Sequence, residues 1–288
     1  MLLFSRLYFF AIDLRSIFSN NNGLPINKGQ LFATYLKFRI KLALYKTFHL
    51  NWSEEEFFGL KISFFLYGDF FTLWREIFVW GNYFFESRTE RPVIIDAGSN
   101  IGMSVLFFKF LYPEAQIICF EPDPDSFEML KRNIETNHFS NISIYNVALS
   151  NKEEPLTLYR STSKGGVGHT TKTYLRLEDK PIATQVISKK LSTFIETHVD
   201  FLKIDIGGAE YQVLRDLKMK LPLVDRLVIE VHHPDGEDRP SEMLSILENA
   251  GFTYSISIPL SINTHYDLIK SATNTNDALM LDAWRKHV

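Results

Sequence analysis

The fold of this chain is decided by one stretch, Val93-Ile94-Ile95-Asp96-Ala97-Gly98-Ser99-Asn100-Ile101-Gly102. An apolar run that ends at a carboxylate and passes into a glycine-containing turn is typical of a buried strand followed by a helix. The apolar stretch from Ile101 to Tyr112 predicts that helix, and Pro113 ends it, because proline cannot continue an α-helix. The segment therefore predicts a strand, a tight turn and a helix.

The same alternation continues to the end of the chain. Short apolar runs predict six more strands, at residues 116–120, 142–147, 201–206, 227–231, 252–258 and 278–284. Helical patterns lie between several of them, at residues 124–137, 209–218 and 241–250. Strands that alternate with helices of about ten to fifteen residues form βαβ units and a parallel sheet. We therefore expect an α/β, doubly wound (Rossmann-like), mainly parallel seven-stranded sheet, with the last two strands as an antiparallel edge pair.

The N-terminal part of the chain differs in composition from the rest. Residues 1–85 hold 24 of the 41 aromatic residues, and residues 1–50 carry seven Lys and Arg against one acid, Asp13. We expect a mostly helical, aromatic-rich cap region at residues 1–88 and a single domain at residues 89–288. Two interpretations of the cap stay open: its aromatic residues pack on the domain, or its basic surface contacts a membrane or a lipid-linked substrate.

Local signals within the cap region are mixed. Ser53-Glu54-Glu55-Glu56 has capping-box spacing before an apolar run, which predicts that a helix starts there. The segment from Lys61 to Leu66 is typical of a short strand, and the segment from Asp69 to Trp80 predicts a helix capped by Asp69. From Leu36 to Leu42 apolar and basic residues alternate as in a strand, inside a stretch that otherwise favours helix.

Composition excludes several classes of protein. The 288 residues carry a net charge of −3, so there is no basic field over the whole chain that would favour nucleic acid as a partner. The single cysteine, Cys119, excludes an internal disulfide framework and fits a reducing compartment. The most apolar stretch, residues 1–18, is interrupted by Arg6, Asp13 and Arg15, which argues against a membrane-spanning helix. We expect a cytoplasmic protein, in solution or attached to the membrane surface.

Three predicted strands end in acidic or glycine-rich residues. In an open parallel sheet, ligands bind beyond the carboxyl ends of the strands. The first strand ends at Asp96, before a turn with two glycines, Gly98 and Gly102, where a dinucleotide-binding turn has three. A carboxylate there would repel a pyrophosphate but suits an ammonium or sulfonium ligand. Glu121 follows the second strand and can accept the hydroxyls of a ribose, and Asp205 ends a later strand.

At this point the sequence resembles the FkbM-type S-adenosylmethionine-dependent methyltransferases. The resemblance covers roughly residues 74–235. It rests on four segments: Ile95-Asp96-Ala97-Gly98-Ser99-Asn100-Ile101-Gly102, Phe120-Glu121-Pro122-Asp123-Pro124, Asn146-Val147-Ala148-Leu149 and Phe201-Leu202-Lys203-Ile204-Asp205. It implies S-adenosylmethionine as the cofactor and in-line O-methylation of a sugar or glycan-precursor hydroxyl as the reaction.

The resemblance also implies which residues hold the cofactor. The methionine end would be cradled by Asp96, Gly98, Asn100 and Gly102. The ribose would be held by Glu121, whose loop also contains Pro122 and Asp123, and the adenine would be bordered by Asn146, Val147 and Ala148. One departure stands out: the family has a glutamate before the glycine that follows the Asp-containing strand, and this chain has Gly207-Gly208.

A sugar hydroxyl is a poor nucleophile at neutral pH, so we expect a general base. Four candidates stay open: Asp205 at the end of its strand, His169 in a glycine-rich insertion, Glu210 on the next helix, and His232 after another strand. Asp205 could instead only cap the helix after it.

Other functions also stay open at this stage. Asp205, Glu230 and a histidine could bind Mg²⁺ or Mn²⁺, although no spacing requires it, and we assign no metal ligands. The missing glutamate at position 207 leaves a non-catalytic binding or scaffold protein as an alternative. A nucleotide-dependent oxidoreductase is the third interpretation, disfavoured by the missing third glycine.

Overall fold

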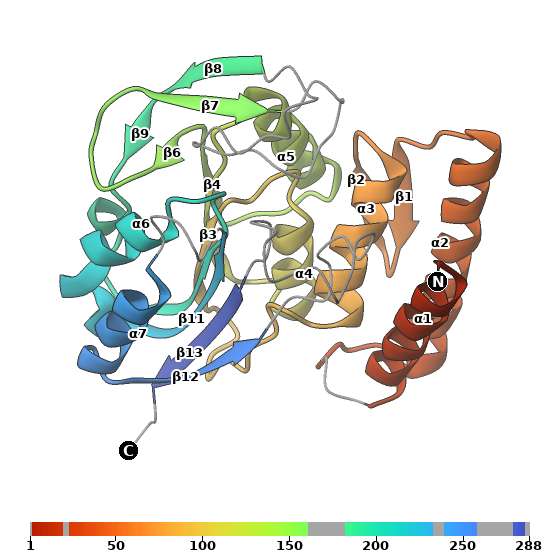
Figure 1. Ribbon diagram of the computed structural model, residues 1–288, viewed down its shortest axis with the longest axis horizontal. Helices are drawn as coiled ribbons and strands as arrows, with labels where there is room; N and C mark the ends of the chain where they lie inside the picture. The colour runs from red at the N-terminus through yellow and green to blue at the C-terminus, as the bar shows by residue number, and fades with distance from the viewer. Residues whose placement is uncertain (1, 20–22, 161–181, 233–238, 258–278, 286–288) are drawn as a thin grey trace.

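The centre of the molecule is a seven-stranded sheet (Figure 1). The computed structural model describes residues 2–19, 23–160, 182–232, 239–257 and 279–285. The strands of the sheet lie in the order β12-β13-β11-β10-β3-β4-β5. Their bounds in that order are Phe252–Ser257, Leu279–Arg285, Val224–Val231, Val199–Ile204, Val93–Ala97, Gln116–Phe120 and Ile142–Tyr145.

The strands run as the sequence predicts. The four pairs β11–β10, β10–β3, β3–β4 and β4–β5 are parallel, and β13 is antiparallel to both of its neighbours. The expected antiparallel pair at the end of the chain is therefore present, but β13 lies between β11 and β12, so of these two strands β12 alone lies at the edge of the sheet. The predicted doubly wound, mainly parallel seven-stranded sheet is confirmed.

The chain reverses its direction of winding between β3 and β10. From β3 it passes through α4 (Met103–Leu111), β4 and α5 (Pro124–Thr136) to β5. From β10 it passes through α6 (Glu210–Asp216) to β11 on the other side, and α7 (Pro240–Asn249) precedes β12. Adjacent strands that wind in opposite directions leave a crevice at their carboxyl ends. The candidate functional site is therefore the crevice beyond the ends of β3 and β10.

Helices cover both faces of the sheet, and each face has its own core. Because side chains alternate along a strand, Ile94 and Phe201 face one cluster while Ile95 and Leu202 face the other. The first cluster contains α4 and the aromatic residues of the N-terminal region, and the second contains α6 and α7. Smaller pieces lie at the top of Figure 1: β6 (Ala148–Leu149) pairs with β9 (Ser188–Lys189), and β7 (Leu156–Arg160) pairs with β8 (Ile182–Val186).

The N-terminal region is helical at its start. It begins with α1 (Leu2–Ser19) and α2 (Lys28–Phe48), and α2 includes the whole segment whose alternation resembles a strand. Asn27 caps α2 by accepting a hydrogen bond from the Gln30 backbone. The buried residues of α2 recur with helical spacing at Leu31, Tyr35 and Phe38, and this packing selects the helix over the strand.

Two local predictions for this region are wrong. No helix starts at Ser53: residues Glu54–Phe57 form β1, which pairs with β2 (Leu60–Ser63). Phe58 and Gly59 both have positive φ, the geometry of a two-residue hairpin turn, and Glu55 is buried where Lys37 and Lys41 contact its carboxylate. These tertiary contacts override the capping signal.

The helix predicted at Asp69 begins earlier than expected. The helix α3 spans Tyr67–Trp74, its N-cap is Leu66, and no side chain caps it. It continues as a single π-helical turn, Arg75–Val79. Asp69 lies inside the first turn, where a negative charge is favourable but does not mark the start of the helix.

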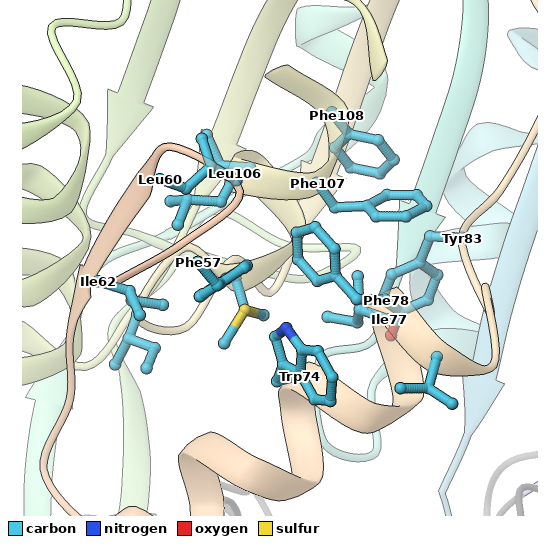
Figure 2. Packing of buried hydrophobic residues seen from close by; sticks show 14 of the residues in the cluster. Phe57, Leu60, Ile62, Trp74, Ile77, Phe78, Tyr83, Leu106, Phe107 and Phe108 are labelled. Carbon is cyan, nitrogen blue, oxygen red and sulfur yellow. The ribbon is translucent and has the colours of Figure 1, made fainter. Parts of the chain in front are cut away.

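The aromatic residues of the N-terminal region pack against one another and also against α4 and β10 of the main domain. Figure 2 shows Phe57, Trp74 and Phe78 beside Phe107 of α4. The ring of Phe78 makes edge contacts with Phe57 and Phe107, at centroid distances of 5.1 and 5.2 Å. Nearer the sheet, Phe85 stacks on Phe201 of β10 at 4.5 Å. Residues from both parts of the chain therefore share one core.

We predict that Phe78→Ala lowers the free energy of unfolding by about 3–5 kcal/mol, because a fully buried ring is replaced by a cavity. Urea denaturation followed by circular dichroism measures it. The matched control is Phe48→Ala, since Phe48 is 66% exposed and its loss should change stability little. A loss for Phe78→Ala no larger than that of the control would contradict the shared core.

Candidate functional site

Polar side chains from three strands meet at the crevice between β3 and β10. In the parallel register, Asp96 of β3 lies opposite Lys203 of β10 on one side and Cys119 of β4 on the other. Glu121 follows β4 directly, and Asp205 follows β10 directly. The predicted site residues on these three strand ends are therefore brought together by the sheet.

The turn after β3 depends on backbone conformations that favour glycine. Gly98, Asn100 and Gly102 have φ values of +88°, +48° and +91°. A Cβ atom on Gly98 would lie 1.8 Å from the carbonyl oxygen of Asp205, so the turn passes against the end of β10 with no room for a side chain. The Gly98 N–H donates to Phe120 O at 2.9 Å, which joins the turn to the end of β4.

Asp96 is completely buried at the head of this turn. Its Oδ2 accepts a hydrogen bond from the Ser104 hydroxyl at 2.5 Å. Its Oδ1 lies 3.2 Å from the Lys203 ammonium in an ion pair. A carboxylate oxygen has two lone pairs, so Oδ1 keeps capacity to accept a further hydrogen bond from a ligand.

Lys203 is a buried cation at the centre of the site. Its Nζ donates to Gly98 O at 2.7 Å and lies 3.4 Å from Asp205 Oδ2, in addition to the contact with Asp96. Burial alone would lower the pKa of this ammonium, but the carboxylates of Asp96 and Asp205 outweigh it and hold the pKa above its ordinary value. Lys203 therefore stays charged and ties the ends of β3 and β10 together.

Glu121 is buried in the loop after β4. Its Oε2 accepts from the Asn100 N–H and its Oε1 from the Asp123 N–H, each at 2.8 Å. Burial raises the pKa of Glu121 to about 7, although these backbone hydrogen bonds act in the opposite direction. This carboxyl group therefore changes charge close to neutral pH.

The remaining residues predicted near the nucleoside make hydrogen bonds or packing contacts that hold the loops after β4 and β5 in place. Asp123 caps α5 by accepting from the Ser126 N–H at 2.9 Å. The Asn146 amide donates to the carbonyl oxygens of Glu121 and Pro122, which positions the loop after β5 against the loop after β4. Val147 packs against the second core cluster, and Ala148 is buried in β6.

Asp205 follows β10 and is more exposed than the neighbouring carboxylates of Asp96, Glu210 and Glu230, with 29% of its side chain accessible to solvent. Its Oδ2 accepts from the phenol of Tyr83 at 3.3 Å. Burial, with a further contribution from Asp205, raises the pKa of that phenol, so Tyr83 remains a donor. Asp205 does not cap α6, whose N-cap is Ala209. The N-terminal part of the chain thus contributes the Tyr83 side chain to the site.

A second group of polar side chains lies beside Asp205. His232, which follows β11, has its Nδ1 2.9 Å from Glu210 Oε1 and its Nε2 3.8 Å from Asp205 Oδ1. Burial favours neutral imidazole, but Glu210 prevails and the pKa of His232 is raised to about 10. Burial and the neighbouring Asp205 raise the pKa of Glu230 to about 8. Near neutral pH, His232 is therefore an imidazolium.

Glu210 lies three residues after Gly207, the position at which the sequence departs from the family that it resembles. It is fully buried and accepts from the backbone N–H groups of Ile206 and Gly208. Gly207 and Gly208 both have positive φ, so the backbone turns back and brings Glu210 under His232. A buried carboxylate is thus present beside Asp205 although position 207 has no side chain.

The structure also locates residues that could hold a metal ion. Asp205, Glu230 and His232 each offer one donor atom, all within 4.8 Å of one another. The imidazolium of His232 would have to lose its Nε2 proton before it could bind a metal. His169, the fourth candidate base, lies outside the described residues.

Three residues of the candidate site are not indicated as such by the sequence. Lys203 belongs to a segment that carries the family resemblance, but a lone lysine inside an apolar strand suggests no role. Tyr83 lies in a segment without a recognised motif, and the sequence suggests Glu230 only as a metal ligand. A charged residue in an otherwise apolar strand was the one signal available, since such residues are buried only with a partner.

Comparison with known proteins decides the family. The model of the methyltransferase FkbM domain matches residues 96–254 of this chain. The chain belongs to the FkbM methyltransferase family. The predicted resemblance is confirmed, and family membership together with the fold supports methyltransferase activity.

Three curated relatives of this FkbM-family chain are similar over most of its length. Methyltransferase 1 of Beauveria bassiana is 29% identical and covers 64% of this chain and 82% of its own. The hexuronic acid methyltransferase AglP of Haloferax volcanii is 26% identical, covering 60% and 68%. The 31-O-demethyl-FK506 methyltransferase FkbM of Streptomyces tacrolimicus is 28% identical, covering 63% and 81%.

The expectation about membrane spans can be compared with the described helices. Among them, none is both long enough and apolar enough to cross a bilayer.

We predict that Gly98→Ala lowers the free energy of unfolding by about 2–4 kcal/mol, since the new methyl group collides with the Asp205 carbonyl and φ is left-handed. Gly68→Ala is the matched control, because a Cβ on Gly68 meets nothing within 4 Å. Thermal unfolding of the two variants tests the difference. Equal stability would show that the ends of β3 and β10 are not in close contact.

Proposed function

We propose that this chain is an S-adenosylmethionine-dependent O-methyltransferase whose acceptor is a hydroxyl group of a sugar or glycan precursor. The observation that carries the proposal is the meeting of Asp96, Glu121 and Asp205 around a left-handed glycine turn at the point where the sheet reverses direction. This is the position at which an open α/β sheet binds its ligand.

The residues at this edge fit a cationic, adenosine-containing ligand. Charged acidic groups outnumber basic ones: Asp96, Asp205 and Glu210 surround Lys203 and His232, whereas the raised pKa of Glu230 keeps that carboxyl group largely protonated near neutral pH. Such an excess suits a sulfonium better than a pyrophosphate. The remaining hydrogen-bonding capacity of Asp96 Oδ1 supports the placing of the methionine end, with its ammonium group, beside Asp96, Gly98, Asn100 and Gly102.

The opposite end of the cofactor would lie over the loop after β4. Glu121 accepts two backbone hydrogen bonds, and its carboxylate lone pairs leave capacity for the ribose hydroxyls. Asn146, Val147 and Ala148 continue from this loop and would border the adenine. Pro122 and Asp123 would shape the loop, since Asp123 caps α5.

The acceptor class rests on two of the relatives. One is named a hexuronic acid methyltransferase, and another is named for a 31-O-demethyl compound. Both names indicate small acceptors, and the second names an oxygen. We propose that residues 1–88 border the acceptor as a cap on the domain at residues 89–288, which is consistent with the contact between Tyr83 and Asp205.

When bound, S-adenosylmethionine supplies the electrophilic methyl group. The chain's own contribution is to orient the acceptor oxygen on the methyl axis and to remove its proton, and positioning alone can supply about 7–11 kcal/mol. Among the four candidate bases, Asp205 is the one we assign to proton removal. It is part-exposed at the carboxyl end of β10, while the Tyr83 phenol and Lys203 hold its Oδ2.

The other candidates have different roles in this proposal. Glu210 is fully buried and saturated by backbone N–H groups and His232, so it orients the histidine. His232 carries a proton near neutral pH and faces Asp205 through Nε2, so it stabilises negative charge beside the acceptor. His169 stays a candidate that the described residues do not test.

We predict that binding of S-adenosylmethionine strengthens with pH. Below the Glu121 pKa of about 7, the carboxyl group is protonated and loses capacity to accept the ribose hydroxyls. Affinity measured by isothermal titration calorimetry should therefore be about tenfold higher at about pH 8 than at about pH 6. Glu121→Gln should bind more weakly and without this pH dependence. Absence of binding to folded protein at the higher pH would overturn the cofactor assignment.

We predict that Asp205→Asn lowers turnover by about 10²–10⁴-fold while the affinity for S-adenosylmethionine stays unchanged, because a base is lost and the cofactor contacts remain. Transfer of a labelled methyl group to a panel of hexuronic acids and neutral sugars measures it. Asp225→Asn, at the opposite end of the neighbouring strand, is the control and should keep wild-type turnover. Full activity in Asp205→Asn would assign the base elsewhere.

A further inference from the structure

The outer side of α2 exposes apolar residues that the main fold does not use. Leu36 and Ile40 are 36% and 61% exposed, and Ala33 and Ala43 are exposed at the same three- and four-residue spacing. Residues with this spacing share one face of a helix. We call Ala33, Leu36, Ile40 and Ala43 the outer stripe of α2.

The opposite side of the same helix is already buried. Leu31, Tyr35 and Phe38 face the core, and helical spacing places them on the face opposite the outer stripe. A helix at the surface of a globular protein is normally apolar on one face only. The second apolar face therefore has no partner in the fold of this chain among the residues that the structure describes.

Further apolar side chains are exposed at positions close to α2 in the sequence. Phe48 ends α2 with 66% exposure and Leu50 follows with 47%, while Tyr8 and Phe18 of α1 are 58% and 51% exposed. Six of the eleven large hydrophobic side chains that are exposed in the described residues lie within residues 8–50. Figure 1 shows α1 and α2 at the outer edge of the molecule, with α3, β1 and β2 between them and the sheet.

The charge of this segment is positive. Residues 1–50 carry seven Lys and Arg, and their one acid, Asp13, is buried and accepts hydrogen bonds from Tyr35 and Trp80. Helical spacing places Lys37 and Lys46 on either side of the outer stripe. In neighbouring β1, Glu55 is shared by two lysines, Lys37 and Lys41, so it leaves positive charge uncompensated.

We propose that the outer stripe of α2, with Phe48 and Leu50 and the flanking basic residues, binds the surface of a membrane that contains anionic lipid. Exposed apolar residues flanked by lysines are the features of a helix that lies in the headgroup region, where each basic residue adds attraction to the anionic surface. A second copy of this chain is a poorer partner, because the same face would bring like charges together.

The experiment is flotation of the full chain with vesicles of phosphatidylcholine alone and with vesicles that also contain about 30 mol% phosphatidylserine. The wild-type chain should float with the phosphatidylserine vesicles only, and high salt should release it because the attraction is screened. Ile40→Glu should lower the partition coefficient about tenfold, because it removes an apolar contact and adds a repelled charge.

The matched control is Ile256→Glu, which changes a half-exposed isoleucine on the edge strand β12, far along the sheet from α2. It should float like the wild type, and both variants should keep the wild-type melting temperature and affinity for S-adenosylmethionine. Failure of the wild-type chain to float, or equal flotation of Ile40→Glu, overturns the proposal. A concentration-dependent increase in mass that Ile40→Glu abolishes also overturns it and assigns the stripe to self-association.

Discussion

A buried ammonium group holds the functional edge of this sheet together. Lys203 stands near the carboxyl end of β10 with its Nζ between Asp96 and Asp205, and it also donates to the Gly98 carbonyl. Parallel pairing puts Asp96 and Lys203 at the same level of adjacent strands, so the ion pair forms wherever the register is correct. Buried charges persist only when they are paired, so the two carboxylates and the lysine depend on one another.

This ion pair changes how the acidic site is understood. From the sequence, Asp96 is a lone carboxylate at the head of a glycine turn, and its charge is the argument against a pyrophosphate. In the structure Lys203 compensates much of that charge, and the other carboxyl groups of the edge, Asp205, Glu210 and Glu230, lie further along beside His232. The cationic ligand that we propose would therefore be recognised by the whole edge rather than by Asp96 alone.

The aromatic excess of the N-terminal region is explained by packing on one face of the sheet. Phe85 stacks on Phe201, the rings around Phe78 reach α4, and Tyr83 reaches Asp205. The N-terminal region therefore forms part of the core on this face of the sheet, and through Tyr83 it also contacts the candidate site. The outer stripe of α2 is the part of this region that packing does not explain, and its apolar and basic character sets it apart from the aromatic core.

Sequence by itself determined the sheet and the resemblance to the family, and it predicted a site at the strand ends. Apolar strands ending in Asp96, Glu121 and Asp205 are local signals, because each is set by side-chain periodicity and turn chemistry within about ten residues. The choice between helix and hairpin at Glu54–Phe57 was different: a buried glutamate between two lysines of α2 decided it. The contacts of Lys203, Tyr83 and His232 likewise join segments far apart in the chain. Only the tertiary structure could decide them, since burial and the distance between charges are set by strands and helices that meet after folding.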